Sequence, residues 1–260
     1  MSQRIVRYER ADKISYGLME GEDRIAPLPG DPFNGLVPSG DAVALAEVRL
    51  LCPLPAPRIF GVGLNYVSHA EEMNLPQPKV PMLFMKPSTA AVGPGDPIWY
   101  PPEAKNLHFE AEVAVVIGKQ GRRVSEAEAL DLVLGYTCGN DVSERVIQRA
   151  EMDQGCLLIG KGYDSFNPLG PTIATGLDPT DIGLIGRVNG EERQRNNTSD
   201  LIYSIASLIA YMSQAMTFLP GDVIMSGTPS GVGPVEPGDT VEIEIDGAGV
   251  LSNPVVAEEA

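Results

Sequence analysis

The chain has 260 residues, enough for one large domain or two smaller ones, and 43% of them are hydrophobic, so it can bury a sizeable core. Its formal net charge of −16 and pI near 4.5 argue against nucleic-acid partners, which bind clustered Lys and Arg. No stretch approaches the roughly 18 apolar residues of a membrane helix, and the first residues lack the apolar segment of a signal peptide. We therefore expect a cytoplasmic protein with no membrane partner. The three widely separated cysteines favour reduced thiols over disulfides or a thiolate zinc site.

Turn-forming residues are abundant, with 28 glycines and 23 prolines but no repeated tract, which favours a mixed α/β class that is mostly β. Near the N-terminus, β-branched and apolar residues predict a small meander with strands at residues 5–9, 14–19 and 24–26. Three prolines between residues 53 and 57 then mark a boundary. The sequence predicts a small β-rich N-terminal domain over residues 1–55 and a larger domain over residues 56–260.

The larger domain is predicted to mix strands with short helices. Ser125 and Glu128 have the spacing of a capping box, which begins a helix. Between Leu201 and Met212, apolar residues recur every three to four positions, as on the buried face of a helix. The predicted elements in chain order are a strand at Ile59–Gly63, a helix at 65–73, a helix from Ser125 to about Leu134, a helix after Asp200, and strands at Val223–Met225 and Thr240–Ile245.

The segment 108–118 reads as a strand because of its many β-branched residues. Side chains alternate across a strand, so His108, Glu110 and Glu112 share one face, with neighbours on that face roughly 6–7 Å apart. Two carboxylates at that range in a buried strand raise each other's pKa or require a cation. The alternative is a solvated edge strand. The apolar run at 115–117 favours burial on both faces, and oxygen ligands suit Mg²⁺, Mn²⁺ or Ca²⁺ better than zinc.

A third carboxylate, Asp141, follows an apolar run that ends in Gly139-Asn140, which is turn and N-cap chemistry. A helix that begins there places Asp141, Arg145 and Gln148 on one face, at the i, i+4 and i+7 positions. A metal ligand, a guanidinium and an amide could then converge on one small anionic substrate. The alternative is a helix cap followed by an exposed charged face.

Two glycine-containing segments, at residues 61–63 and 160–162, lack the features of nucleotide-binding loops. Tyr66 stands where a dinucleotide fingerprint needs its third glycine. The segment around Lys161 lacks the Walker spacing and the Ser or Thr that follows the lysine. Nucleotide binding is therefore not expected.

Six motifs between residues 58 and 255 occur in the order used by the fumarylacetoacetate hydrolase superfamily, and together they identify a resemblance to it. They are Gly61-Val62-Gly63-Leu64-Asn65-Tyr66-x-x-His69, Phe84-Met85-Lys86-Pro87-Ser88-Thr89, His108-Phe109-Glu110-Ala111-Glu112, Gly135-Tyr136-Thr137-x-Gly139-Asn140-Asp141-Val142-Ser143, Gly160-Lys161 and Gly227-Thr228-Pro229-Ser230-Gly231-Val232-Gly233.

The resemblance implies a catalytic domain with a mixed β-roll, a smaller N-terminal domain and a homodimer. It implies a Mg²⁺ or Mn²⁺ site formed by Glu110, Glu112 and Asp141. By motif position, Lys161 matches an active-site lysine, and His69 with Glu72 resembles a catalytic dyad on a lid. The residues expected to face substrate are Arg145, Gln148 and Thr228.

The expected substrate is a 2-oxo acid that chelates the metal, which stabilises the enolate formed when the bond beyond C3 breaks. The leading hypothesis is hydrolysis of a C–C bond in an acylpyruvate-like 2,4-dioxo acid, with His69 deprotonating water. The alternative is a lyase or isomerase that decarboxylates a 2-oxo diacid or shifts a double bond in a hydroxymuconate-type product of aromatic catabolism. A catalytically silent member is a more distant third. Residues 152–159 depart from many relatives, so substrate choice is not carried over.

Overall fold

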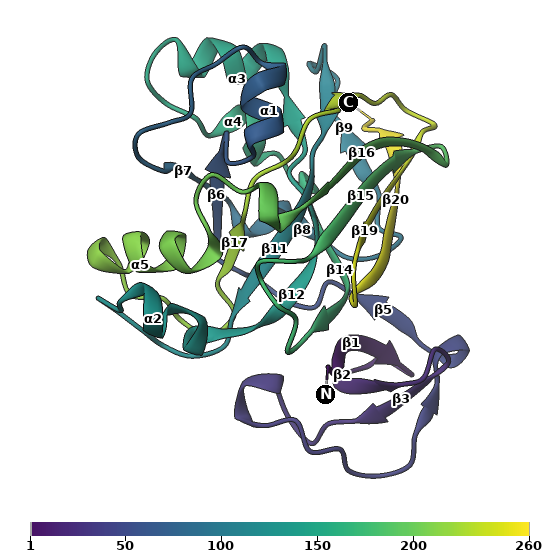
Figure 1. Ribbon diagram of the computed structural model, residues 1–260. Helices are drawn as coiled ribbons and strands as arrows, with labels where there is room; N and C mark the ends of the chain where they lie inside the picture. Colours follow the sequence, from purple (N-terminus) through teal and green to yellow (C-terminus); the bar gives the residue numbers. More distant parts are fainter. Residues whose placement is uncertain (1, 260) are drawn as a thin grey trace.

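The computed structural model describes residues 2–259, which form a mixed α/β fold made mostly of strands (Figure 1), as predicted. The largest sheet has twelve strands, in the order β4-β3-β2-β1-β14-β12-β11-β17-β6-β7, with β5 beside β1 and β8 beside β14. Its strands are β1 (Arg4–Arg10), β2 (Lys13–Glu20), β3 (Arg24–Pro27), β4 (Val43–Ala44), β5 (Arg49–Leu51), β6 (Ile59–Gly63), β7 (Met82–Lys86), β8 (Ala91–Val92), β11 (Ala111–Ile117), β12 (Val133–Asn140), β14 (Asn167–Ala174) and β17 (Val223–Met225).

Two smaller sheets complete the β structure. The five-stranded sheet has the order β16-β15-β19-β20-β9, and the three-stranded sheet has the order β13-β10-β18. Their strands are β9 (Ile98–Tyr100), β10 (Leu107–Phe109), β13 (Ser143–Glu144), β15 (Gly183–Val188), β16 (Glu191–Asn197), β18 (Gly233–Pro234), β19 (Thr240–Ile245) and β20 (Gly249–Ala257). The predicted strand 108–118 is therefore two strands, β10 and β11, that belong to different sheets and meet at Glu110.

The helices are short and lie outside the sheets. They are α1 (Val67–Glu72), α2 (Glu126–Ala129), α3 (Arg145–Met152), α4 (Ile159–Gly162) and α5 (Ile205–Ala215), and the 3-10 turns are η1 (Pro32–Asn34), η2 (Leu45–Glu47), η3 (Ser88–Ala90), η4 (Leu130–Leu132) and η5 (Thr198–Asp200). In Figure 1, α1, α3 and α4 gather at one end of the molecule, and α2 lies near α5. Within residues 2–259, no helix has both the length and the apolar character needed to cross a membrane.

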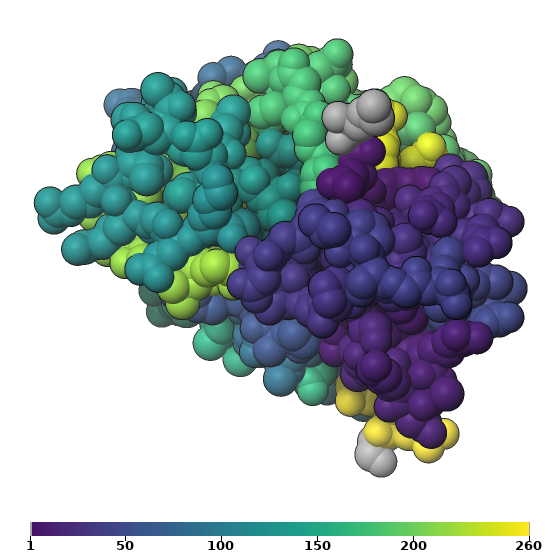
Figure 2. All heavy atoms as spheres, turned by 90° about the horizontal axis from the view of Figure 1, so that it is seen from below, coloured from purple at the N-terminus to yellow at the C-terminus, as the bar shows by residue number. Residues whose placement is uncertain are grey.

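The predicted N-terminal meander is present as β1, β2 and β3, which pair antiparallel in sequence order. Its sheet does not end at the proline cluster, because β1 also pairs with β14 of the larger part of the chain. Figure 2 shows this N-terminal part covering part of one face of the molecule, beside later segments. The domain boundary near residue 55 stays a prediction. The large sheet contains strands from both sides of that boundary.

Two helices differ in extent from the prediction. The capping box is present, since Ser125 N–H donates to Glu128 Oε2 at 3.0 Å, but α2 ends early and β12 begins at Val133. Pairing of Val133 with Ile117 in β11 takes these residues into the sheet, which outweighs their helical pattern. The later helix begins at Ile205, because the side chain of Ser204 caps it.

Strand β11 lies at the centre of the fold, and all seven of its residues are buried. Its two faces contribute to different cores. Val113 and Val115 face a core shared with the five-stranded sheet, and Ala114 and Val116 face a core shared with β1 and β14. The prediction that this strand is buried on both faces is confirmed. Glu112 and Glu110 lie on the same face as Ala114 and Val116, nearer the start of the strand. Two carboxylates are therefore directed into the interior.

Candidate metal centre and active site

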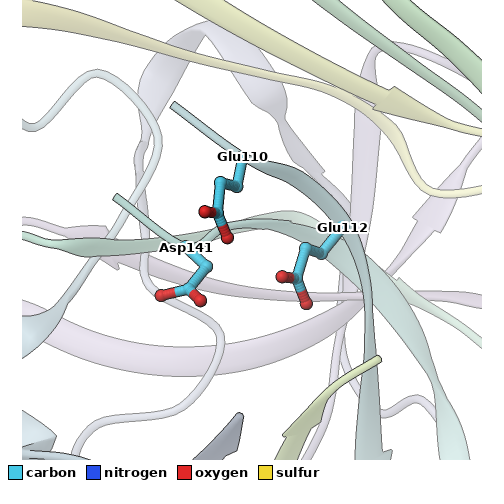
Figure 3. Close-up of side chains that lie close together, drawn as sticks. All are labelled: Glu110, Glu112 and Asp141. Carbon is cyan, nitrogen blue, oxygen red and sulfur yellow. The ribbon is translucent and has the colours of Figure 1, made fainter. Parts of the chain in front are cut away.

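Three buried carboxylates meet where β11 begins beside the end of β12 (Figure 3). Antiparallel pairing places Ala111 opposite Asn140, so Asp141 lies next to Glu110, and Asp141 N–H donates to the Glu110 carbonyl at 3.0 Å. One carboxylate oxygen each from Glu110, Glu112 and Asp141 lies within 4.8 Å of the others. The structure thus brings together the three residues predicted to hold a metal.

Asp141 does not begin a helix, so the predicted i, i+4, i+7 geometry is wrong. It follows β12, the short strand β13 comes next, and α3 begins only at Arg145. Glu144 sets this start, because its carboxylate accepts a hydrogen bond from Ile147 N–H at 2.6 Å. Arg145 and Gln148 nevertheless line the same cavity as Asp141, and Arg145 donates to Gln148 Oε1 at 2.8 Å.

Three cationic side chains surround the carboxylates. Lys161 Nζ lies 2.6 Å from Asp141 Oδ2 and 3.1 Å from Glu110 Oε2. Arg145 contacts the other oxygen of Glu110 at 2.6 Å, and Lys86 forms a short ion pair with Asp141 Oδ1. The cluster therefore holds three acidic and three basic groups, and both lysines and all three carboxylates are almost completely buried.

The pKa shifts follow from burial and these neighbours. Burial acts to raise the pKa of Glu110, but Lys161, Arg145 and His69 outweigh it and hold this pKa well below its usual range. Glu112 is different, because burial and then the charges of Asp141 and Glu110 raise its pKa well above its usual range. Glu112 accepts one hydrogen bond, from Gly227 N–H at 2.8 Å, and has no cationic partner among the described residues. Its carboxylate is the group that most requires a further positive charge.

The donor set fits a hard divalent cation. All three candidate ligands are carboxylates, which suit Mg²⁺ or Mn²⁺, and their close approach without a cation on Glu112 is electrostatically unfavourable. Gly227 is needed for this arrangement: its φ is +103°, and a Cβ there would lie 2.8 Å from the Cβ of Asn65. Asn65 in turn donates to the Ser226 carbonyl at 2.8 Å and fixes the loop beside Glu112.

His69 and Glu72 form the predicted pair on α1. His69 Nδ1 lies 3.0 Å from Glu72 Oε2, and Glu72 Oε1 accepts from Gly231 N–H at 2.9 Å. In the tautomer whose Nδ1 donates to this carboxylate, Nε2 is the ring's proton acceptor. The helix is tied to the body of the protein through Ser68, whose hydroxyl accepts from Asn196 Nδ2 at 2.8 Å. The dyad is therefore held in one orientation.

A cavity of about 1070 Å³ connects the carboxylates with His69. Its polar wall contains every predicted site residue except Glu72, which lies behind His69. Its other wall is apolar and comes mostly from the segment after α1, from β7 and from the loop after α3. The main apolar lining residues are Met73, Leu75, Met82, Leu83, Phe84, Met152, Leu157 and Val232.

Thr228 lines the cavity, but its hydroxyl is already engaged. It donates to the Ala111 carbonyl at 2.9 Å and accepts from Gln194 Nε2 at 2.8 Å. Gln194 is fully buried on β16, and its Oε1 accepts from Ala111 N–H at 2.9 Å. One side chain thus joins the peptide between the two glutamates to the loop that carries Thr228.

Sequence reasoning missed three residues that shape the site. Lys86 lies in one of the quoted motifs, but it is 55 residues away in the sequence from Asp141, which it contacts. Gln194 stands in a polar strand with no local signal. Glu151 accepts from the N–H groups of Ile159 and Gly160, at 2.8 and 2.9 Å, and so fixes the start of the short helix that carries Lys161. A buried Lys or Gln cannot be recognised from spacing alone.

Replacing Gln194 with Leu is expected to lower the free energy of unfolding by about 2–4 kcal/mol, because Ala111 N–H and the Pro229 carbonyl lose their buried partner. Urea denaturation measures this change. Gln214→Leu is the matched control, since Gln214 is exposed on α5, and it should change stability by less than about 0.5 kcal/mol. Equal effects of the two substitutions would contradict the bridging role of Gln194.

Comparison with known proteins agrees with this geometry. Residues 58–256 match the family model "Fumarylacetoacetate (FAA) hydrolase C-terminal", and residues 3–53 match "Rv2993c-like, N-terminal". The crystal structure of 2-hydroxyhepta-2,4-diene-1,7-dioate isomerase from Mycobacterium marinum is 41% identical, with a TM-score of 0.91 over 99% of this chain and 100% of that one.

Two further relatives differ in the reactions that their names give. The mitochondrial oxaloacetate tautomerase fahd2 of Xenopus laevis is 44% identical over 81% of this chain and 69% of its own length. Fumarylpyruvate hydrolase from Pseudomonas aeruginosa, solved in complex with Mn²⁺ and pyruvate, is 35% identical, with a TM-score of 0.75 over 81% of this chain and 92% of that one. The chain belongs to the fumarylacetoacetate hydrolase family.

Proposed function

We propose that this protein is a divalent-metal-dependent hydrolase that cleaves a C–C bond of an acylpyruvate-like 2,4-dioxo acid. The observation that carries the proposal is one cavity lined both by the carboxylate triad and by His69, whose ring is oriented by Glu72. Glu110, Glu112 and Asp141 would hold Mg²⁺ or Mn²⁺, which when bound supplies Lewis-acid polarisation of the substrate's 2-oxo group. The Mn²⁺ and pyruvate bound by the Pseudomonas hydrolase are consistent with this ligand chemistry.

The protein's own residues perform the proton transfer. His69 accepts a proton at Nε2 from a water molecule, and the hydroxide adds to the distal carbonyl carbon of the substrate. The bond between that carbon and C3 then breaks, and its electron pair passes to C3. A proton returned to C3 completes the reaction, so one water and one dioxo acid give a carboxylic acid and a 2-oxo acid. Glu72 stabilises the imidazolium that forms on His69.

His69 is better suited to this role than His108, which also lines the cavity. Burial and then the charge of Arg145 lower the pKa of His108 to about 4, so this ring is a weak base. Its Nε2 lies 3.1 Å from Asn106 Oδ1, and no carboxylate orients it. His69 has a carboxylate partner and lines the cavity.

The cationic side chains of the cavity suit the anionic end of a 2-oxo acid. Burial acts to lower the pKa of Lys161, but Asp141 and Glu110 raise it, so its ammonium remains charged. Arg145 and Gln148 would bind the substrate carboxylate from the same wall, and Thr228 would join them by exchanging its bond to the Ala111 carbonyl for one to the substrate. The apolar wall formed by Met73 and its neighbours would accommodate the acyl arm that leaves as the carboxylic acid.

A second candidate is an isomerase, tautomerase or decarboxylase that uses the same residues without adding water to a carbonyl. The names of the Xenopus and Mycobacterium marinum relatives favour proton transfer at a 2-oxo acid or dienedioate. In a tautomerase or isomerase, His69 would remove and return protons on the substrate carbon chain. In a decarboxylase acting on a 2-oxo diacid, it would only return the proton to C3.

The deciding experiment incubates the protein, with Mn²⁺ or with chelator, with an acylpyruvate, oxaloacetate and a hydroxymuconate-type dienoate, and identifies products by NMR. We expect metal-dependent cleavage of the acylpyruvate. Glu112→Gln should lower kcat/KM on the order of 10³-fold, which corresponds to about 4 kcal/mol. Glu242→Gln, on the partly exposed face of β19, is the matched control and should leave kcat/KM unchanged.

The products distinguish the candidates. Keto–enol exchange of oxaloacetate without C–C cleavage of any dioxo acid would establish a tautomerase instead, and loss of carbon dioxide from oxaloacetate would establish a decarboxylase. Turnover that persists at full rate in chelator would contradict every metal-dependent candidate.

His69→Gln tests the proton acceptor. Loss of the general base should lower kcat by about 10²–10⁴-fold while Mn²⁺ affinity, measured by calorimetry, stays within a few-fold of the unmodified protein. His108→Gln is the comparison, since the chain has only these two histidines, and it should cost less than tenfold. A His69→Gln protein with unchanged turnover would exclude the dyad from the reaction.

We also propose a homodimer. Several apolar side chains on or next to α3, α4 and the edge strand β7 are about half exposed. They lie close to the cavity. They are Met85, Val146, Met152, Leu158 and Ile159. Exposed apolar surface next to a site is typical of a protein–protein interface.

Light scattering should give twice the chain mass of 27.7 kDa. Met85→Lys should shift the mass toward that of the single chain, because it places a charge in the apolar interface. Val250→Lys, on the exposed part of β20, should not. A single-chain mass for the unmodified protein would overturn the homodimer.

A further inference from the structure

The hydrogen bonds of the carboxylate triad show that its cations are not equivalent. Among the three candidate ligands, Arg145 contacts only Glu110, at the oxygen Oε1, and Lys86 contacts only Asp141, at the oxygen Oδ1. Lys161 alone bridges two of the candidate ligands, because its ammonium lies 3.1 Å from Glu110 Oε2 and 2.6 Å from Asp141 Oδ2. A divalent cation shared by the triad requires oxygens from these same two residues.

The two lysines also differ in how firmly they are held. The side chain of Lys86 is fully buried, and its ammonium donates to the carbonyls of Phe166 at 2.6 Å and Val142 at 3.3 Å in addition to Asp141. Three fixed acceptors satisfy its three donors. Lys86 is therefore a permanent part of the framework that orients Asp141.

Lys161 has partners that do not depend on the carboxylates. Ser143 Oγ lies 2.8 Å from its ammonium, and the ring of Phe84 lies 5.0 Å away, within the range of a cation–π contact. It is carried by a four-residue helix and lines the cavity. A small rotation of its flexible side chain could move the ammonium away from the carboxylates and into the cavity. Its contacts with Ser143 and Phe84 would be kept.

We propose that the ammonium of Lys161 is a resident counter-ion that a divalent cation displaces from Glu110 and Asp141, and that this displacement turns Lys161 toward the substrate. The inference rests on the metal site of the proposed function and adds an order to it: the metal binds first, and the substrate-facing position of Lys161 follows. Without metal, Lys161 neutralises carboxylates that could not otherwise stay buried together. With metal, the same lysine is free to neutralise negative charge that develops on the substrate.

The ammonium of Lys161 is therefore expected to weaken metal binding. Lys161→Met should tighten Mn²⁺ binding to the chelator-treated, dialysed protein at least tenfold, as measured by calorimetry at constant pH, because no ammonium then competes for the ligand oxygens. Lys86→Met is the matched control. It removes the same charge from the same cluster, but Lys86 contacts only one candidate ligand and does not lie between two of them. It should leave Mn²⁺ affinity unchanged or lower it, because Asp141 loses its orientation.

Three results would overturn the displacement: unchanged affinity in Lys161→Met, weaker binding in Lys161→Met, or equal tightening in both variants, which would reflect net charge alone. Absence of Mn²⁺ binding to the unmodified protein is a different failure, because it would remove the metal site itself. Failure of the displacement and failure of the proposed function are thus distinguishable.

Thermal unfolding provides a second measurement. Metal-free Lys161→Met leaves buried carboxylates without their cation, so its Tm should fall below that of the unmodified protein, and saturating Mn²⁺ should raise its Tm by a larger increment. If Lys161→Met does not fold without metal, Lys161→Gln serves instead, because it keeps a hydrogen-bond donor but lacks the charge. An Mn²⁺ increment no larger than that of the unmodified protein would contradict the proposal.

Discussion

The structure depends on keeping three carboxylates together in its interior. Burying an unpaired carboxylate has a large free-energy cost, so each carboxylate needs a fixed partner. Glu110 has Arg145 and Lys161, Asp141 has Lys86 and Lys161, and Glu112 has only a backbone N–H group. The imbalance is concentrated on Glu112, whose pKa is raised by burial and by its acidic neighbours. A divalent cation would supply the missing charge, which explains why the fold maintains a cluster that is otherwise unfavourable.

The sequence predicted those parts of the site that depend on local periodicity. Alternation along one strand was sufficient to place Glu110 and Glu112 on a common face, and the β-branched run was sufficient to predict burial. Asp141 was correctly predicted to join the two glutamates, but the predicted helix was not the reason. The pairing of β11 with β12 brings Asp141 next to Glu110. Lys86 was not predictable, since its contact with Asp141 joins the last residue of β7 to the residue that follows β12. Local patterns identify candidate ligands, whereas long-range pairing selects their partners.

The site determines the type of chemistry more closely than the particular reaction. A triad for a cation, a nearby ammonium and an oriented imidazole suit any step in which a 2-oxo acid gains or loses a proton beside its carbonyl. Hydrolysis additionally requires a water next to His69 and space for an acyl arm, and the apolar wall around Met73 and Leu75 provides that space. This wall comes from the segments after α1 and α3. Differences in these segments are therefore expected to separate hydrolases from isomerases and tautomerases in the family.

The rigid and the adjustable parts of the site are carried by different elements. Glu72 joins His69 to the loop that contains Thr228, through Gly231 N–H, and Gln194 joins that loop to the peptide between the two glutamates. His69, Thr228 and the peptide between Glu110 and Glu112 are thus connected by a chain of hydrogen bonds. Among residues 2–259, Lys161 is the one cation that shares its ammonium between two carboxylates of the triad, and it also contacts Ser143 and Phe84. In the proposed displacement, a change of charge at the triad would therefore move only the side chain of Lys161, while the hydrogen bonds that join His69, Thr228 and the glutamates would be kept.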